Sequence, residues 1–302
     1  MQFKKILKDI KDLKIQGAEN IAVAALKSID ELNKNSKTQN TKRLVADLEK
    51  ARRLLIETRP TEPCMRNALF YVFHNLDKIN NIHESKEYIS KKISESINHF
   101  ELSKRIIAEI GSNKIRDGSV VFTHCHSSTV IEILKEAKRK GKTFNVHCME
   151  TRPLFQGRKT AKELAAFGIP VTYYIDSAAR LALKKADIAF IGADSISSTG
   201  DVINKIGSEL FSEIANKYEI SVYSCTDSWK FNPRTIFGFD EVIEKREYEE
   251  IWKNAPKNIK IETSAFEKVH NSLITGIISE LGIFRPDVFV EEAKRAYPWM
   301  LF

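Results

Sequence analysis

The chain has 302 residues, of which 42% are hydrophobic, and it carries a formal net charge of +8. This length supports one large domain or two ordinary domains, each with its own core. No apolar run is long enough to cross a bilayer, and Asp9 and Asp12 in the first amphipathic stretch argue against a signal peptide. The positive charge is compatible with an anionic substrate, but the aromatic–basic motifs of nucleic-acid-binding modules are missing. We therefore expect neither a membrane nor a nucleic acid as a partner.

The four cysteines and seven histidines are scattered along the chain. The cysteines form no C-x-x-C pair and the histidines form no H-E-x-x-H, so neither a zinc ribbon nor a redox pair is indicated. Reduced thiols are typical of a cytoplasmic protein. We predict a cytoplasmic protein that uses no metal and no cofactor.

Residues 1–111 are predicted to form an N-terminal helical domain, because apolar side chains recur there at helical spacing. A polar break at residues 35–40 and a stiff two-proline turn at residues 58–63 separate the helices. The last helix is a long amphipathic stretch, residues 86–110, that ends at Gly111.

After this glycine, short β-rich segments alternate with helical ones, and residues 112–302 are predicted to form a second domain. The alternation is typical of a parallel α/β sheet, whose ligands bind beyond the carboxyl ends of the strands. Polar or charged residues follow every predicted strand, so an active site is expected at that edge. The strands are predicted at residues 119–124, 144–149, 171–175, 187–193 and 220–225, and the helices at residues 129–139, 160–167, 177–184 and 204–218.

The segment THCHSS places Cys125 between a strand end and a helix start. The helix N-terminus and the flanking His124 and His126 favour the thiolate, and a capping box from Thr129 to Glu132 would fix the helix end. A thiolate can act as a base, a nucleophile or a metal ligand. The alternative is a buried cysteine that only packs. A metal is disfavoured because no carboxylate or second cluster completes a ligand set.

Asp194 directly follows a predicted apolar strand. A carboxylate walled by apolar neighbours at a strand exit suits general acid–base catalysis. The alternative is a turn or helix cap, which is the role predicted for Asp201 in the segment TGD.

Several residues are candidates for holding an anion. Asn204 and Lys205 are predicted to open a helix, whose free amides suit a phosphate, and a lysine is unfavourable there unless it has a specific role. Arg152 and Arg158 can bind phosphate bidentately or form structural ion pairs. Weaker candidates in the helical domain are Arg59 and, at a helix start, Gly17 and Ala18.

The motifs THCHSS, ETRPLFQGRKTAKELAAFGIPV, IDSAAR, GADSI, GDVINKIGS and WKFNP occur in this order along the chain. Together they resemble the superfamily of methylthioribose-1-phosphate isomerase, archaeal ribose-1,5-bisphosphate isomerase and the regulatory subunits of eukaryotic translation initiation factor 2B. The resemblance extends from IQGA near the N-terminus to ISELGIFRP near the C-terminus. It is strongest for the archaeal ribose-1,5-bisphosphate isomerases.

The resemblance implies an N-terminal helical domain followed by a Rossmann-like α/β domain, with the site between them. Cys125 and Asp194 fall on the positions of the isomerases' catalytic cysteine and aspartate, a pair that the regulatory subunits generally lack. Family members often have Arg-Gly-Ala where this chain has Gln16 before Gly17 and Ala18, so one charge of the phosphate loop is missing while the two amides remain. The positions that contact substrate in the family correspond to Arg59, Asn204, Lys205 and Lys230.

The implied reaction converts α-D-ribose 1,5-bisphosphate into D-ribulose 1,5-bisphosphate during AMP and nucleoside salvage. Cys125 would act as the base at C2, and Asp194 as the proton donor. The family also implies a homo-oligomer, either a dimer or a hexamer. The alternatives are a methylthioribose-1-phosphate isomerase, a non-catalytic regulator that binds nucleotides or an initiation-factor subunit, and a scaffolding oligomer.

Overall fold

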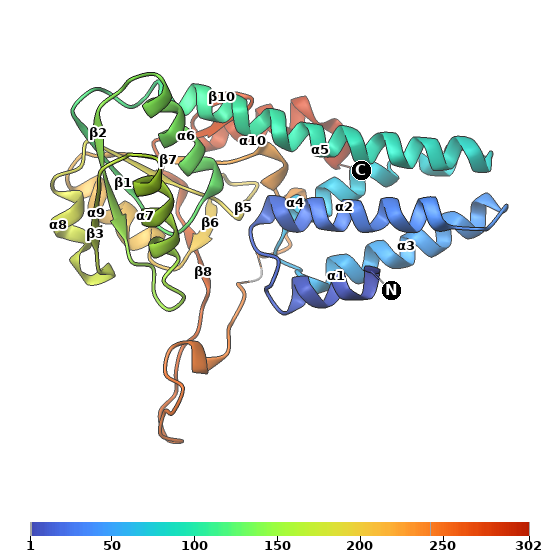
Figure 1. Cartoon of the computed structure of the whole chain (residues 1–302), viewed down its shortest axis with the longest axis horizontal. Helices are drawn as coiled ribbons and strands as arrows, with labels where there is room; N and C mark the ends of the chain where they lie inside the picture. The colour runs from blue at the N-terminus through green and yellow to red at the C-terminus, as the bar shows by residue number, and fades with distance from the viewer. Residues whose placement is uncertain (1, 242, 302) are drawn as a thin grey trace.

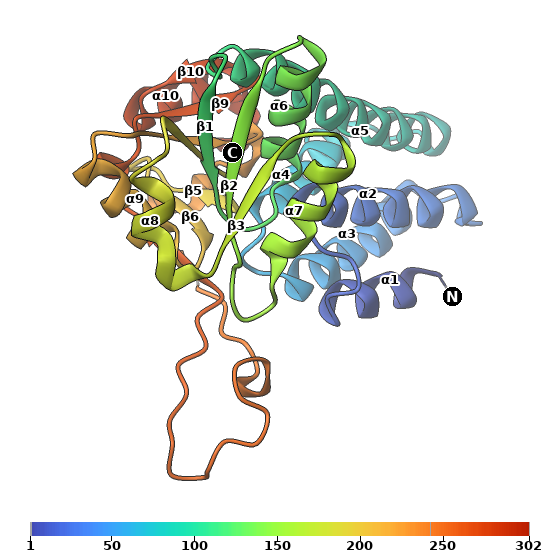
Figure 2. The same cartoon turned by 60° about the vertical axis from the view of Figure 1, so that its left-hand side comes forward.

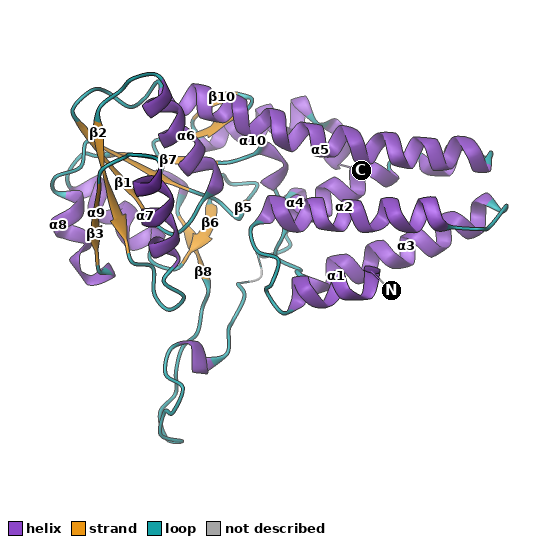
Figure 3. Ribbon diagram, viewed as in Figure 1, coloured by secondary structure: helices purple, strands orange, loops and turns teal. Residues whose placement is uncertain are grey.

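The computed structural model describes residues 2–241 and 243–301, which form a helical part and an α/β part side by side (Figure 1). Figure 3 shows the long helices gathered on one side of the molecule and the strands on the other. No helix within the described residues combines the length and apolarity needed to cross a membrane.

The chain is helical up to Ser112, as its periodicity predicts. Helices α2 and α4 pack against each other and against the long α5, which also contacts α6 and β9 of the α/β part. Asparagine side chains begin two of the helices: Asn40 accepts the N–H of Arg43, and Asn81 accepts the N–H of His83. The bounds are α1 Gln2–Lys11, α2 Ala18–Asn35, α3 Thr41–Thr58, α4 Pro63–Phe73, η1 Leu76–Lys78 and α5 Ile82–Ser112.

The main sheet has seven strands in the order β10-β9-β7-β4-β1-β2-β3, and only the β10–β9 pair is antiparallel. The order runs in opposite directions from β1 and β4, so the gap between their carboxyl ends is the topological switch point of the sheet. The predicted α/β class is therefore confirmed. The strands are β1 Ser119–Thr123, β2 Phe144–Met149, β3 Val171–Tyr174, β4 Ile188–Ile191, β7 Ser221–Cys225, β9 Gly276–Ser279 and β10 Gly282–Phe284.

The connecting helices lie close to the predicted positions, with two corrections. The predicted capping box is wrong, because α6 begins one residue before Thr129 and its cap is Ser127, which accepts the N–H of Val130. The predicted helix 204–218 is wrong at its start, because α9 begins at Ser208. The bounds are α6 Ser128–Arg139, α7 Gln156–Ala166, η2 Asp176–Ala178, α8 Ala179–Leu183 and α9 Ser208–Lys217.

A second, three-stranded antiparallel sheet, β5-β6-β8, lies beyond β4 and was not predicted. Its middle strand, β6 (Val202–Lys205), contains Asn204 and Lys205, so these residues do not open a helix. Gly207 has a φ of 100° and ends the extended segment before α9. The partner strand β8 (Phe266–Val269) is distant in sequence, and local periodicity cannot reveal such a pairing; β5 is Ser195–Ile196.

The helical and α/β parts pack against each other through one continuous hydrophobic core. After β10, helix α10 (Pro286–Ala296) and the turn η7 (Pro298–Leu301) return to the helical part. There the ring of Trp299 lies 5.0 Å from that of Tyr71 and 5.1 Å from that of Trp229. The boundary predicted between residues 111 and 112 separates helices from sheet, and as a domain boundary it stays a prediction.

A long excursion between η4 (Pro233–Phe237) and β8 leaves the body of the molecule, and Figure 2 shows it as an open loop. We call residues 238–265 the arm. Its base is closed by pairing of Lys245 with Ser264 and by the hydrogen bond from the Ala265 amide to the Glu244 carbonyl, 2.9 Å long. This base brings the side chain of Glu244 to the helical part, where it contacts Arg59.

Candidate active site

A cavity of about 460 Å³ lies between the helical part and the strand ends. Its walls come from the start of α2, the turn between α3 and α4, the exits of β1 and β4, strand β6, and the turn after β7. The eight residues that are predicted to act on or bind the substrate all line it: Gly17, Ala18, Arg59, Cys125, Asp194, Asn204, Lys205 and Lys230. Residues far apart in the chain are thus brought together, but their roles remain proposals.

The start of α2 presents backbone amides to the cavity. Gly17 is the N-cap with φ 88°, a conformation that glycine adopts without strain, and it makes no side-chain cap. The Gln16 amide donates to the Leu13 carbonyl at 2.8 Å, so this side chain is taken up by its own loop. The helix start can therefore offer N–H donors to an anion without a charge from residue 16.

Cys125 sits at the exit of β1 in a left-handed conformation, with φ 66°. Its amide donates to Thr151 Oγ1 at 3.0 Å, and its carbonyl accepts from Thr160 Oγ1 at 2.8 Å. Thr151, at the exit of β2, is also left-handed, with φ 64°, although it is β-branched. Cys125 and Thr151 thus have strained backbones and are joined by a hydrogen bond where their strands end. Strained residues that cluster in this way are typical of a functional site.

The expectation that the helix start and the flanking histidines favour the thiolate is wrong. Burial raises the pKa of Cys125 to about 11; nearby Lys205 and the His126 amide lower it only in part. Helix α6 starts three residues further on, and the flanking histidines are neutral because burial lowers the pKa of each to about 4. The sulfur therefore carries its proton near neutral pH.

Asp194 lies just beyond β4, where its amide donates to the Ile203 carbonyl at 2.8 Å. Burial raises the pKa of its carboxyl, while Lys230, Lys205 and Arg59 act in the opposite direction. A carboxyl group that keeps its proton more readily than usual can serve as a general acid near neutral pH.

Three cationic side chains face this carboxyl. Lys205 is 9% exposed, and its ammonium lies 4.2 Å from the centre of the Phe266 ring. Lys230, in η3 (Ser228–Lys230), donates to the Ala193 carbonyl at 2.6 Å. Arg59 donates to Glu62 at 2.9 Å and lies 3.2 Å from Glu244 of the arm.

The turn that carries Lys230 is fixed by the helical part. Asn67 of α4 donates to the carbonyls of Trp229 and Phe231 at 2.7 and 2.8 Å. His99 of α5 stacks on Trp229 with ring centres 4.1 Å apart and pairs with Asp227 at 3.1 Å. Any shift of α4 or α5 therefore moves Lys230.

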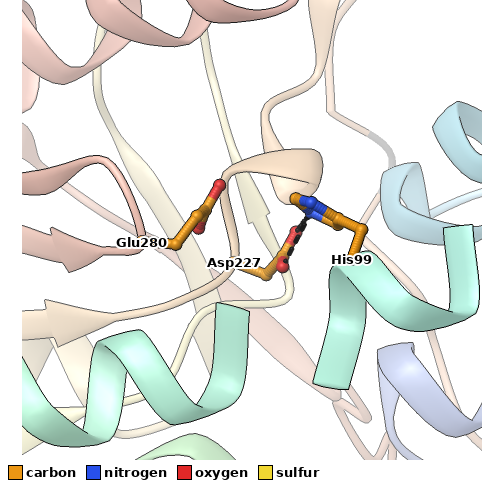
Figure 4. A group of neighbouring side chains, drawn as sticks. All are labelled: His99, Asp227 and Glu280. Atoms are coloured by element: carbon orange, nitrogen blue, oxygen red, sulfur yellow. Dashed lines mark hydrogen bonds and ion pairs between the residues drawn. The ribbon is translucent and has the colours of Figure 1, made fainter. Parts of the chain in front are cut away.

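His99, Asp227 and Glu280 form a buried charge cluster behind this turn. Figure 4 shows the His99 ring directed at the Asp227 carboxylate, with Glu280 on the other side of Asp227. The three ligand atoms lie within 4.8 Å of one another, but Glu280 already accepts from Ser228 and Tyr297. Asp227 pairs with His99, and Glu280 is held by Ser228 and Tyr297, so we interpret the cluster as a structural link.

Protonation differs across this cluster. Burial lowers the pKa of His99, but the Asp227 charge outweighs burial and leaves that pKa raised. Burial and the Asp227 charge together raise the pKa of Glu280 to about 7. The Glu280 carboxyl therefore loses its proton as the pH rises through about 7 and regains it as the pH falls.

Two other sequence candidates, and one further residue at a strand exit, make contacts within the fold. Arg158 pairs with Glu150 at 3.0 Å on the surface. His124 is 1% exposed, with its Nε2 3.0 Å from the Ile206 carbonyl. Asp176, at the exit of β3, accepts the amides of Thr151 and Arg152 at 2.8 and 2.7 Å and so holds the turn after β2.

Sequence reasoning missed Glu62 and Glu244, the two carboxylates on Arg59. Glu62 stands between two prolines in the turn after α3, where it reads as an ordinary turn residue. Glu244 lies in the arm, which has no periodic pattern. Glu62 is three residues from Arg59, but only the tertiary structure shows that their side chains pair and that Glu244 also contacts Arg59.

Comparison with known proteins decides the family. Residues 14–286 match the Initiation factor 2 subunit family. The chain belongs to this family. The resemblance inferred from its motifs is thereby confirmed.

Curated relatives match over nearly the whole chain. The Ribose 1,5-bisphosphate isomerase of Thermococcus kodakarensis is 36% identical, covering 98% of this chain and 95% of the relative. That of Pyrococcus furiosus is 37% identical, covering 97% and 94%. Among solved structures, a translation initiation factor eIF-2B of Pyrococcus horikoshii superposes with a TM-score of 0.83 at 27% identity, covering 95% of this chain and 98% of that one.

Proposed function

We propose that this protein is an aldose–ketose isomerase that converts α-D-ribose 1,5-bisphosphate into D-ribulose 1,5-bisphosphate. The observation that carries the proposal is a thiol and a carboxyl, Cys125 and Asp194, in one buried cavity with several cations. The names of the curated relatives support the same reaction. The superfamily's regulators generally lack the Cys–Asp pair, which favours an enzyme over a regulator.

The chemistry needs one group at carbon and one at oxygen. Phosphate on O1 prevents opening of the ring to a free aldehyde, so the C1–O4 bond must break with the phosphate in place. Cys125, as thiolate, removes the proton from C2; the C–H electron pair forms the C1=C2 bond while O4 leaves with the C1–O4 pair. Asp194 gives its proton to O4. The intermediate is an enol that still carries both phosphates.

The second half returns the protons. The ionised Asp194 accepts the proton of the O2 hydroxyl, and the Cys125 thiol gives its proton to C1. The product is a ketone at C2, and both groups are restored. A thiol with a raised pKa ionises rarely, but its thiolate is a correspondingly strong base. A closed cavity keeps water from the enol and protects it from loss of phosphate.

The binding groups divide between the two parts of the molecule. The amides of Gly17 and Ala18, with Arg59, would hold one phosphate from the helical side. Lys230 would hold the other phosphate, and Asn204 and Lys205 would orient the sugar. A homo-oligomer, dimer or hexamer, is expected in solution, and the reaction would serve nucleoside-phosphate salvage.

The direct test is incubation of the purified protein with α-ribose 1,5-bisphosphate in D₂O. Carbon-13 and phosphorus-31 NMR should detect ribulose 1,5-bisphosphate with deuterium at C1, because the proton passes through an exchangeable thiol. Asp194→Asn is the matched inactive control. Absence of product with the wild-type protein would remove the proposal.

Methylthioribose 1-phosphate is a second candidate substrate. The same cavity is also lined by Leu154 and Phe155, which can contact an apolar thioether. Turnover of this compound in place of the bisphosphate would assign that activity instead. Both substrates belong in the same assay.

A further inference from the structure

Glu62 is an acidic residue in a wall of the cavity that is expected to bind an anion. It is 3% exposed, and it precedes Pro63 at the start of α4 without capping that helix. Its Oε1 accepts from Arg59 at 2.9 Å. Its Oε2 is buried and has no hydrogen-bond partner among the residues that the structure describes.

The charges around Glu62 do not favour a bound anion when every acid is ionised. Arg59 is contacted by two carboxylates, Glu62 and Glu244 of the arm. Together with Asp194, these acids offset the charges of Arg59, Lys205 and Lys230. A phosphate approaching Arg59 would then meet two negative groups already in place, which is unfavourable in a desolvated site.

A proton on Glu62 removes this conflict. A neutral carboxyl group turns its free oxygen from an acceptor into a donor, and an anion in the cavity needs donors. Arg59 can then direct its remaining guanidinium donors to the ligand, since its Nε is also buried without a partner in the described part of the chain.

We propose that Glu62 binds the substrate as a neutral carboxylic acid, so that each anion held at Arg59 enters the site together with one proton. This inference deepens the proposed isomerase, since it assigns a further binding residue to the same cavity. Cys64, Arg59 and Glu244 from neighbouring segments, and Asp194 and Lys230 from the strand exits, are the other ionisable groups that face Glu62.

The pKa of the Glu62 carboxyl agrees with this role. Burial and the Asp194 charge raise its pKa to about 7, although Arg59 and Lys230 act in the opposite direction. A bound anion adds negative charge and raises this pKa further. Above pH 7 most Glu62 carboxyls are ionised before the anion binds, so binding takes up a proton. The affinity for the anion therefore falls by up to ~10-fold per pH unit on the alkaline side.

The test uses sulfate, whose charge is constant between pH 6 and pH 8.5, so that any proton taken up comes to the protein. Titration calorimetry at pH 7.5 in buffers of different ionisation enthalpy gives the number of protons bound with sulfate. The wild-type protein should take up about half to three quarters of a proton, and sulfate should bind several-fold more tightly at pH 6.5 than at pH 8. Uptake near zero, or no sulfate binding at pH 6.5, overturns the proposal without any variant.

Three variants identify the residue that carries the proton. Glu62→Gln should abolish the uptake and flatten the pH dependence of sulfate affinity. Glu280→Gln, which changes the other carboxyl with a pKa of about 7, should retain the uptake. Uptake that persists in Glu62→Gln but disappears in Asp194→Asn would place the proton on Asp194 and overturn the assignment.

The sulfate result and the isomerase assay can fail separately. Turnover of ribose 1,5-bisphosphate without proton-linked sulfate binding would leave the isomerase standing and remove the role of Glu62. Proton-linked sulfate binding without turnover would remove the isomerase and leave the role of Glu62 in anion binding standing. Thermal melting at each pH confirms that the variants compared are folded.

Discussion

At the scale of single residues, burial sets the protonation of the candidate site, because it raises the pKa of both Cys125 and Asp194. Cys125 and Asp194 could be found because both stand where an apolar strand ends in polar residues. The neutral thiol could not be foreseen, because it results from burial by segments distant in the chain. Glu62 was missed for the same reason: its pKa depends on burial and on Asp194 and Lys230, which only the fold brings near.

Cys125→Ser should remove most turnover, because a hydroxyl is a far poorer base than a thiolate. The expected loss in kcat is about 10²- to 10⁴-fold, typical of a missing acid–base group. Substrate affinity should change little, and both are measured by a direct assay of ribulose 1,5-bisphosphate and by calorimetry. A serine variant with nearly wild-type turnover would show that the sulfur is not the base.

Lys230→Ala should weaken binding of the bisphosphate by about 10- to 100-fold, the effect of one lost charge-assisted contact. A substrate with a single phosphate, such as methylthioribose 1-phosphate, should lose much less. Comparison of KM for the two compounds checks this. Equal losses would mean that Lys230 fixes the Ala193 carbonyl beside Asp194 without binding the second phosphate.

At the scale of elements, local pattern predicted strands well and long-range pairing poorly. The strand 144–149 was predicted with its observed bounds, since its flanks are polar and its partner is a neighbour in sequence. Strand β6 was mistaken for helix because β8, with which it pairs, follows after the arm. The cross-strand contacts that stabilise β6 form only when residues 202–205 pair with residues 266–269 in the folded chain.

The connection from β2 to α7 gives a prediction at this scale. A Cβ on Gly157 would lie 1.7 Å from the Met149 carbonyl oxygen, so the helix could not keep its position against the strand. Gly157→Ala should lower the free energy of unfolding by at least ~3 kcal/mol in urea denaturation.

Gly168→Ala is the matched control for this prediction. Gly168 has φ 76°, but a Cβ there meets nothing within 4 Å, so only backbone strain of about 1 kcal/mol is expected. Similar losses in both variants would show that the close approach at Gly157 costs no more than backbone strain does at Gly168, and would contradict the prediction.

At the scale of the whole molecule, the cavity is an interface between the two parts of the chain. The helical part supplies Arg59 and Glu62, and it also holds the turn of Lys230 through Asn67 and His99. The sequence predicted both parts and the edge of the sheet that bears the site. It could not predict how the helices approach that edge, because the contacts of η7 with α4 join segments that are far apart in the chain.

The cluster behind this turn predicts a pH-dependent stability. The pKa of Glu280 is raised from 4.5 to about 7, so the folded state binds its proton more tightly than the unfolded state. The resulting stabilisation is present in full below pH 4.5 and is lost as pH rises through 7. Glu280→Gln cannot lose a proton, so its free energy of unfolding relative to wild type should increase between pH 5 and pH 8.

The measurement is urea denaturation of both proteins at each pH, with an effect on the order of 1 kcal/mol for each unit of pKa shift. Glu213→Gln, an exposed change on α9, is the control and should leave the pH dependence unaltered. A difference between wild type and Glu280→Gln that stays constant with pH would contradict the prediction.

The left-handed backbone at Cys125 constrains the mutations that evolution can accept at this position. Among the residues that one nucleotide change from a cysteine codon can produce, glycine suits this backbone best, and it would relieve strain of about 1–3 kcal/mol. The same change deletes the proposed base. Loss of the proposed catalysis is therefore one step away and releases backbone strain, which gives a physical route from an isomerase to a folded, inactive binding subunit within a single family.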